Sequence, residues 1–134
     1  MNTKPRQCLV ALAAGIITGA ATYGIYRLTG GAPEPVSTIP KLLLICLAGP
    51  LLEEAIFRGL AFAPAQRYLR NNGAIFLCAV LFGLAHWGIP QSFLAFGAGL
   101  VFGYLRVKDN TLLSPILAHI AANVMLVVLQ TIQL

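Results

Sequence analysis

Acidic side chains are scarce in this chain. Only four of its 134 residues are Asp or Glu, nine are Lys or Arg, and 58% are hydrophobic. Soluble domains carry about 25% charged residues against 10% here, so the composition excludes an ordinary soluble domain. We predict one integral membrane domain over residues 1–134, because about four to six spanning helices would use nearly all of this length.

Cysteine is also sparse. The three cysteines, Cys8, Cys46 and Cys78, lie in apolar runs and lack the paired spacing of a metal site or a disulfide framework. We therefore predict packing roles for them, with no metal and no other cofactor. The net charge of +5 comes from basic residues at helix ends, which favours contact with the lipid bilayer and predicts no nucleic-acid partner.

Five apolar segments are separated by breaks rich in glycine, proline or charge. They predict an all-α fold, a polytopic membrane helix bundle of about five transmembrane helices. A basic start precedes the first apolar run, and its length favours an uncleaved first span over a signal peptide. The segments cover approximately residues 7–28, 39–66, 73–87, 91–107 and 112–132.

The basic residues fall unevenly between alternate breaks. Since cytoplasmic loops carry the excess of Lys and Arg, the pattern predicts a multi-pass protein of the cell membrane with a cytoplasmic N-terminus. The opposite side would carry only Arg27 and Lys41. The cytoplasmic side would carry Lys4, Arg6, Arg67, Arg70, Arg106 and Lys108.

Two pairs of glycines are spaced four residues apart, Gly15 with Gly19 and Gly99 with Gly103. Such pairs allow close approach of helices, and we expect them to pack within the bundle, although a homo-oligomer remains an alternative. The last segment carries a helix-start signal, in which Ser114 would cap the first turn and Pro115 would occupy the first helical position.

Three charges interrupt the second segment, at Glu53, Glu54 and Arg58. Each charge near a bilayer centre costs roughly 2.5–3.5 kcal/mol on insertion scales, so the group is a candidate functional site. Glu54 and Arg58 are four residues apart, where a carboxylate and a guanidinium meet on one helix face. Glu53 points about 100° away and has no local cation, which makes it the candidate base. Alternatively, both glutamates pair with Arg58 and only tie helices together.

Two later segments contain the chain's only histidines, and each has a second notable residue on the same helix face. Phe82 and His86 are four apart, as are His119 and Asn123. Each histidine alone is compatible with an interfacial anchor or a helix-to-helix hydrogen bond. One cavity shared with Glu53 would satisfy all these polar groups together, so we expect them to converge there.

The ordered motifs Glu-Glu-x-x-x-Arg, Phe-x-x-x-His and His-x-x-x-Asn resemble those of the CPBP family, the CAAX prenyl protease and bacteriocin-processing family of glutamate-type intramembrane proteases. The resemblance covers about residues 41–128, a catalytic core preceded by the helix of about residues 7–28. It implies that Glu53 and His86 activate water while His119 and Asn123 stabilise the oxyanion. Glu54 and Arg58 would then orient these groups, and Phe82 would shape the pocket wall.

The sequence and the resemblance together predict an intramembrane endopeptidase, a hydrolase that acts on a membrane-associated peptide or protein. Two alternatives stay open. One is a zinc-dependent membrane protease, with Glu53, Glu54, His86 and His119 around the metal. The other is a non-catalytic membrane partner with an immunity or assembly role.

Overall fold

The protein is helical throughout the part that the computed structural model describes, which comprises residues 4–30, 36 and 38–132. No strand occurs among these residues, which confirms the all-α class. In chain order the helices are α1 (Pro5–Leu28), α2 (Ile39–Leu43), η1 (Leu44–Ala48), α3 (Gly49–Glu54), η2 (Ala55–Ala61), α4 (Phe62–Leu84), α5 (Ile89–Asp109) and α6 (Leu113–Ile132), where η denotes π-helix.

The helices follow the five predicted segments closely. Helical structure is continuous from α2 into α4, and α4 changes direction at Arg70, whose φ of 59° is left-handed. A non-glycine residue is uncommon in this conformation. The change of direction divides α4 into a part before Arg70 and a part after it. Among the described residues, α1 and α6 have the length and hydropathy to cross a membrane, so the count of five spans stays a prediction.

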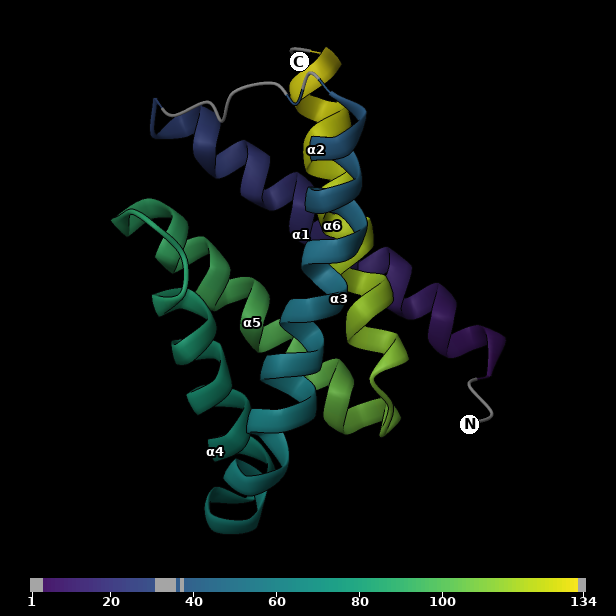
Figure 1. The fold of residues 1–134 in the computed structure, drawn as a ribbon, viewed down its shortest axis with the longest axis vertical. Helices are drawn as coiled ribbons and strands as arrows, with labels where there is room; N and C mark the ends of the chain where they lie inside the picture. The colour runs from purple at the N-terminus through teal and green to yellow at the C-terminus, as the bar shows by residue number, and fades with distance from the viewer. Residues whose placement is uncertain (1–3, 31–35, 37, 133–134) are drawn as a thin grey trace.

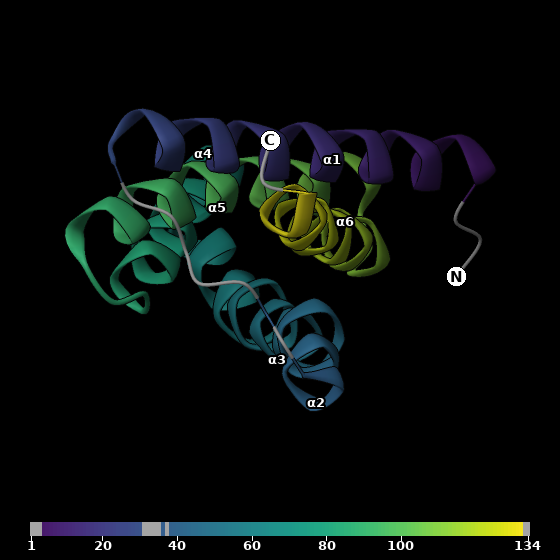
Figure 2. The ribbon, with the colours of Figure 1, turned by 90° about the horizontal axis from the view of Figure 1, so that it is seen from above.

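The helices form two groups around the centre of the molecule. The most extensive helix contacts join α1 to α6 and α4 to α5. Figure 1 shows α2 and α3 alongside α6, with α1 crossing the bundle diagonally. Viewed from above, α1 lies over α5 and α6, whereas α2 and α3 lie on the other side of α6 (Figure 2).

Both glycine pairs pack helices closely within the bundle, as predicted. A Cβ at Gly15 would overlap the carbonyl oxygen of Ala118, and one at Gly19 would overlap that of Ala122, so α1 lies directly on α6. In the second pair, a Cβ at Gly99 would lie 3.0 Å from Cα of Ala79, on α4. The homo-oligomer stays a prediction.

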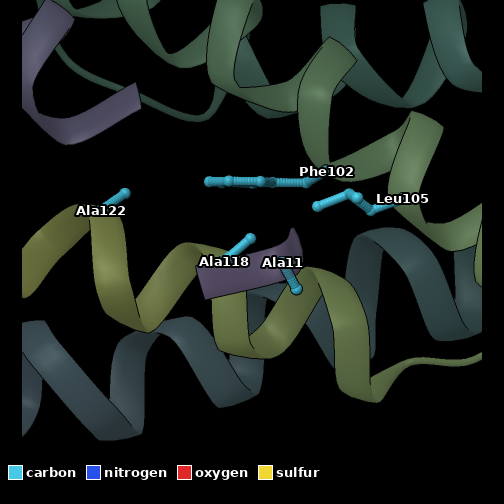
Figure 3. Packing of buried hydrophobic residues seen from close by; sticks show 5 residues of the cluster. All are labelled: Ala11, Phe102, Leu105, Ala118 and Ala122. Atoms are coloured by element: carbon cyan, nitrogen blue, oxygen red, sulfur yellow. The ribbon is translucent and has the colours of Figure 1, made fainter. Parts of the chain in front are cut away.

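A small core joins α1, α5 and α6 (Figure 3). Its buried side chains are those of Ala11, Phe102, Leu105, Ala118 and Ala122. The alanines permit close helix contact, and the Phe102 ring fills the space between them and stacks on the ring of His119 with centroids 4.8 Å apart. The core therefore continues directly into the polar centre of the protein.

The predicted start of the last helix was wrong by two residues. Helix α6 begins at Leu113, so Ser114 and Pro115 lie inside its first turn rather than at its cap and first position. The Leu113 amide instead donates to the hydroxyl of Thr111 at 3.2 Å. The buried Ser114 hydroxyl has no hydrogen-bond partner in the described chain. A threonine two residues before the helix supplies the side-chain acceptor, which leaves Ser114 no capping role.

We expect Gly19→Ala to destabilise the protein, because the added methyl would overlap the Ala122 carbonyl and push α1 away from α6. Overpacking of this kind costs about 1–3 kcal/mol. Gly24→Ala is the matched control, since a Cβ there meets nothing within 4 Å. Thermal unfolding in detergent, followed by the helical circular dichroism signal, should show a lower midpoint for Gly19→Ala alone. Equal midpoints for the two variants would contradict the α1–α6 contact.

Candidate active site

The two glutamates lie on a short α-helix between two π-helices. Helix α3 (Gly49–Glu54) follows η1 and precedes η2. In a π-helix each backbone carbonyl accepts from the amide five residues later, instead of four residues later as in an α-helix. Single π-helical turns occur frequently at functional sites. Their backbone groups are available to side chains of other helices when the local pattern leaves them unpaired.

Pro50 creates one such unpaired group. The Gly49 amide donates to the Leu44 carbonyl, five residues back, so the same pattern would pair the Ile45 carbonyl with residue 50. Pro50 has no N–H, and that bond cannot form. The Nδ2 amide of Asn123 on α6 donates to the Ile45 carbonyl instead, at 2.8 Å. The Gly-Pro pair before the glutamates could have indicated an unpaired carbonyl from the sequence alone. Nothing in the sequence indicated that Asn123 pairs with it.

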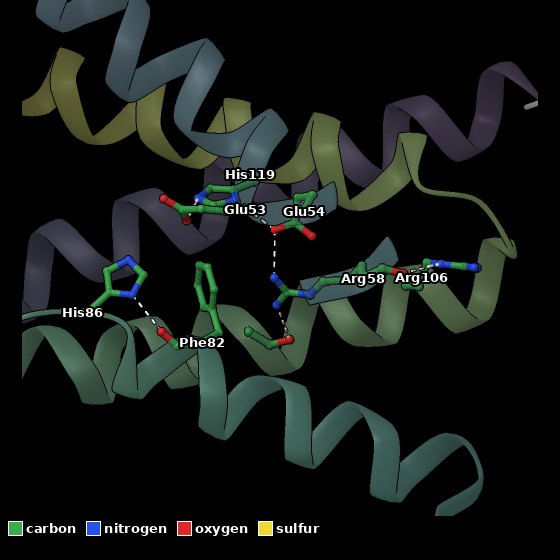
Figure 4. Close-up of polar contacts among 8 residues, drawn as sticks. Glu53, Glu54, Arg58, Phe82, His86, Arg106 and His119 are labelled. Carbon is green, nitrogen blue, oxygen red and sulfur yellow. Dashed lines mark hydrogen bonds and ion pairs between the residues drawn. The ribbon is translucent and has the colours of Figure 1, made fainter. Parts of the chain in front are cut away.

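Glu54 is completely buried, and one of its oxygens accepts two hydrogen bonds. Oε1 accepts from Nη1 of Arg58 at 2.9 Å and from Nδ1 of His119 at 2.9 Å (Figure 4). The first contact confirms the predicted pair on one helix face. The second links η2 and α3 to α6, and the sequence did not predict it.

Arg58 is likewise completely buried and connects Glu54 to the neighbouring helices. Its Nη2 donates to the Gly99 carbonyl on α5 at 3.0 Å, and the guanidinium lies 4.7 Å from the centre of the Phe82 ring. Its own backbone carbonyl accepts from Nε of Arg106 at 3.3 Å. Arg58 therefore compensates the buried carboxylate and also holds α3 against α4 and α5.

Glu53 is placed differently from Glu54. Its side chain is 36% exposed, and Oε2 lies 3.7 Å from Nε2 of His119, which is too long for a hydrogen bond. Oε2 makes no hydrogen bond in the part of the chain that the structure describes. As predicted, Glu53 pairs with no cation on its own helix.

The two histidines have different ring environments. Nδ1 of His86 lies 2.8 Å from the Phe82 carbonyl, which only accepts, so Nδ1 carries the proton. In the neutral ring this leaves the lone pair of Nε2 free to accept a proton. His119 instead donates from Nδ1 to Glu54. The Phe82 ring lies 4.8 Å from the His86 ring and 5.6 Å from the His119 ring, and so contacts both.

One cavity of about 510 Å³ connects these groups. Glu53, Phe82, His86, His119 and Asn123 all line it, as the sequence predicted for a shared site. Glu54 and Arg58 do not line it; they lie on the side of His119 and Phe82 that is away from His86 (Figure 4). The remaining lining residues are Thr18, Gly19, Thr22, Tyr26, Leu44, Ile45, Gly49, Gln91, Leu94, Ala95, Ala98, Phe102, Ala122 and Leu126.

The residues of the zinc alternative do not group into a ligand set in the structure. Across the described residues, no group of three or more His, Cys, Asp or Glu side chains is arranged to hold a metal ion. Glu54 in particular is engaged with Arg58 and His119. The cavity thus offers the Glu53 carboxylate, the Nε2 atoms of His86 and His119, and the Asn123 amide.

Comparisons with known proteins place the site in context. A family described as Rce1-like, type II CAAX prenyl endopeptidase, has a model that matches residues 35–125. YdiL of Bacillus subtilis (strain 168), assigned by name as a membrane peptidase, is 25% identical over 128 residues, covering 90% of this chain and 52% of YdiL. The membrane-embedded CAAX protease MroQ of Staphylococcus aureus (strain USA300) is 30% identical over 95 residues, covering 66% of this chain and 38% of MroQ. The chain spans about half the length of YdiL and less of MroQ. No solved structure matches.

Arg58→Ala should strongly reduce folded yield, because it leaves the carboxylate of Glu54 buried without its cation. Removing one partner of a buried ion pair costs about 3–5 kcal/mol. Arg67→Ala, at an exposed arginine of α4, is the control. Yield after size-exclusion chromatography and the thermal midpoint report the effect. An Arg58→Ala protein as stable as the Arg67→Ala protein would contradict the proposed dependence on this pair.

The Asn123–Ile45 contact can be tested with a double-mutant cycle. In the wild-type chain, which has Pro50, Asn123→Ala leaves the Ile45 carbonyl unpaired. This should lower the free energy of unfolding by about 1–3 kcal/mol. In the Pro50→Ala protein, the restored amide at residue 50 can donate to that carbonyl, so Asn123→Ala should cost less. The free energy of unfolding of the four proteins gives the coupling. Additive effects would show that Asn123 does not replace the missing amide.

Proposed function

Because the chain belongs to the Rce1-like family of type II CAAX prenyl endopeptidases, we propose that it is a membrane-embedded endopeptidase, a hydrolase that cleaves a membrane-associated peptide or protein. One observation carries the proposal. A carboxylate without a cation on its own helix shares a cavity with a histidine whose Nε2 is free and with two further polar side chains. This is a set of groups that can activate water beside a carbonyl.

Glu53 and His86 are the proposed water-activating groups. A water molecule held by the Glu53 carboxylate and Nε2 of His86 attacks the carbonyl carbon of the peptide bond. As the new C–O bond forms, Glu53 takes a proton from the water. The proton then passes to the departing nitrogen as the C–N bond breaks, so that acid and amine products form. General acid–base catalysis of this kind contributes about 10²–10⁴-fold.

His119 and Asn123 are the proposed oxyanion donors. Glu54 holds Nδ1 of His119, which directs Nε2 toward the side of the cavity where Glu53 lies. When protonated, Nε2 can donate to the negative oxygen that forms. One N–H of the Asn123 amide is fixed on the Ile45 carbonyl, and this bond orients the second N–H, which remains available. Donors fixed before the reaction stabilise the transition state without reorganisation.

We further propose a multi-pass arrangement in the cell membrane with the N-terminus in the cytoplasm. The start of α1, the bend of α4 and the turn between α5 and α6 lie toward one end of the molecule (Figure 1). The end of α6 and the start of α2 lie toward the other end. Most of the basic residues lie in the segments at the first end, which supports a cytoplasmic location for that end.

Glu53→Gln should abolish cleavage while leaving the fold intact, because the amide cannot accept the proton from water. The substrate for this test is a precursor that accumulates uncut in membranes of cells expressing Glu53→Gln but not in those expressing the wild-type chain. With purified protein in detergent, we expect the cleavage rate to fall by about 10²–10⁴-fold. Asp109→Asn is the matched carboxylate-to-amide control, since Asp109 does not line the cavity.

Three results would contradict the proposal in different ways. Full activity of Glu53→Gln would remove Glu53 from the mechanism. Stoichiometric zinc in the purified protein, together with loss of cleavage on chelation, would instead favour the zinc protease. If the Glu53→Gln and His86→Ala chains keep the cellular phenotype while packing variants such as Gly19→Ala lose it, a binding role is correct.

A further inference from the structure

One wall of the cavity comes from a helix that the proposed chemistry does not use. Thr18, Gly19, Thr22 and Tyr26 of α1 line the same cavity as Glu53 and the histidines. Helix α1 ends at Leu28, whereas the match to the family model begins at residue 35. The wall therefore lies outside the part of the chain that the family model matches.

The polar residues of this wall share one face of α1. Thr18, Thr22 and Tyr26 are spaced four residues apart, which places them in a row along the helix. Gly19 fixes the position of that row, since α1 lies so close to α6 there that a Cβ would overlap the Ala122 carbonyl. Ala122 also lines the cavity and directly precedes Asn123. The row is thus held firmly beside the proposed oxyanion donors.

The hydroxyl groups of this row have unused hydrogen-bonding capacity. The Thr18 hydroxyl donates to the Ala14 carbonyl of its own helix at 2.8 Å. The side chains of Thr22 and Tyr26 make no hydrogen bond to any other part of the chain that the structure describes. Much of the surrounding wall is apolar, including Leu94, Ala95 and Leu126. Two hydroxyls that line the cavity without a partner in the described chain can both donate to and accept from a polar ligand.

A peptide segment at a cleavage site supplies the matching groups. A helical segment pairs its own backbone groups, but a peptide bond open to attack must be unwound, which frees neighbouring N–H and C=O groups. In an apolar medium each unpaired backbone group costs several kcal/mol. A hydroxyl that both donates and accepts can pair with either kind of group and does not depend on the side chains of the peptide.

We propose that Thr22 and Tyr26 are positioning residues that bind the unwound backbone of the substrate beside the scissile bond. The proposal rests on the endopeptidase function. It makes α1 a determinant of specificity for segments that unwind within the membrane, in addition to its role in packing α6. Neither residue contacts the reacting atoms, so their loss should affect substrate binding more than the chemical step.

The test measures binding in the Glu53→Gln background, where no cleavage complicates the result. The probe is a synthetic, fluorescently labelled peptide with a single Leu/Ala-rich span and a central Gly-Pro break, and a second peptide has Leu-Ala in place of the break. Thr22→Val and Tyr26→Phe remove one hydroxyl each. Thr131→Val and Tyr104→Phe are matched controls, because neither residue lines the cavity.

We expect each cavity variant to raise the Kd of the broken peptide by about 3- to 10-fold, since one hydrogen bond contributes about 0.5–1.5 kcal/mol. The controls should leave that Kd unchanged, and the unbroken peptide should bind weakly and equally to all the proteins. In chains with Glu53 intact, the cavity variants should raise KM more than they lower kcat. If Thr22→Val fails to fold, Tyr26→Phe and its control carry the test.

Two results would overturn the inference. One is a Kd for the broken peptide that is the same in the cavity and control variants. Another is an equal weakening for both peptides, which would show that the hydroxyls act on helix packing. Failure of the endopeptidase function looks different: the wild-type chain would cleave no precursor, whatever the binding results.

Discussion

The buried carboxylate of Glu54 is the contact on which the rest of the site depends. It accepts from Arg58 and from His119, so a single oxygen joins η2 to α6. Arg58 extends the connection to the Gly99 carbonyl of α5. A buried carboxylate and guanidinium are costly to desolvate, and each is tolerated only while the other is in place. The arrangement of three helices around the cavity thus depends on one ion pair.

Irregular backbone around the glutamates has a second structural consequence. Pro50 removes an amide and leaves the Ile45 carbonyl to Asn123, while the Arg58 carbonyl accepts from Arg106. Backbone groups in an apolar medium must be paired, so each irregular turn requires a polar side chain from another helix. These requirements position Asn123 beside the cavity. Asn123 therefore both pairs with the irregular backbone and lines the cavity.

Much of this architecture follows from local sequence patterns, and the rest depends on contacts between distant residues. Hydropathy and breaks predicted the helical segments, and four-residue spacing predicted the Glu54–Arg58 pair, because both are properties of one helix. The shared cavity followed from the need to pair every buried polar group. The bonds from His119 to Glu54 and from Asn123 to Ile45 join residues 65 and 78 positions apart, so spacing could not reveal them. The Ser114 cap failed because Thr111 supplies the acceptor instead.

The central claim is that adjacent glutamates have separate tasks: Glu54 maintains the fold and Glu53 performs the chemistry. The most direct test measures thermal midpoint and cleavage rate in parallel for Glu53→Gln and Glu54→Gln. The account predicts that Glu53→Gln keeps the wild-type midpoint and loses cleavage, whereas Glu54→Gln unfolds at a lower temperature. A Glu54→Gln protein with the wild-type midpoint, or a Glu53→Gln protein that still cleaves its substrate, would contradict it.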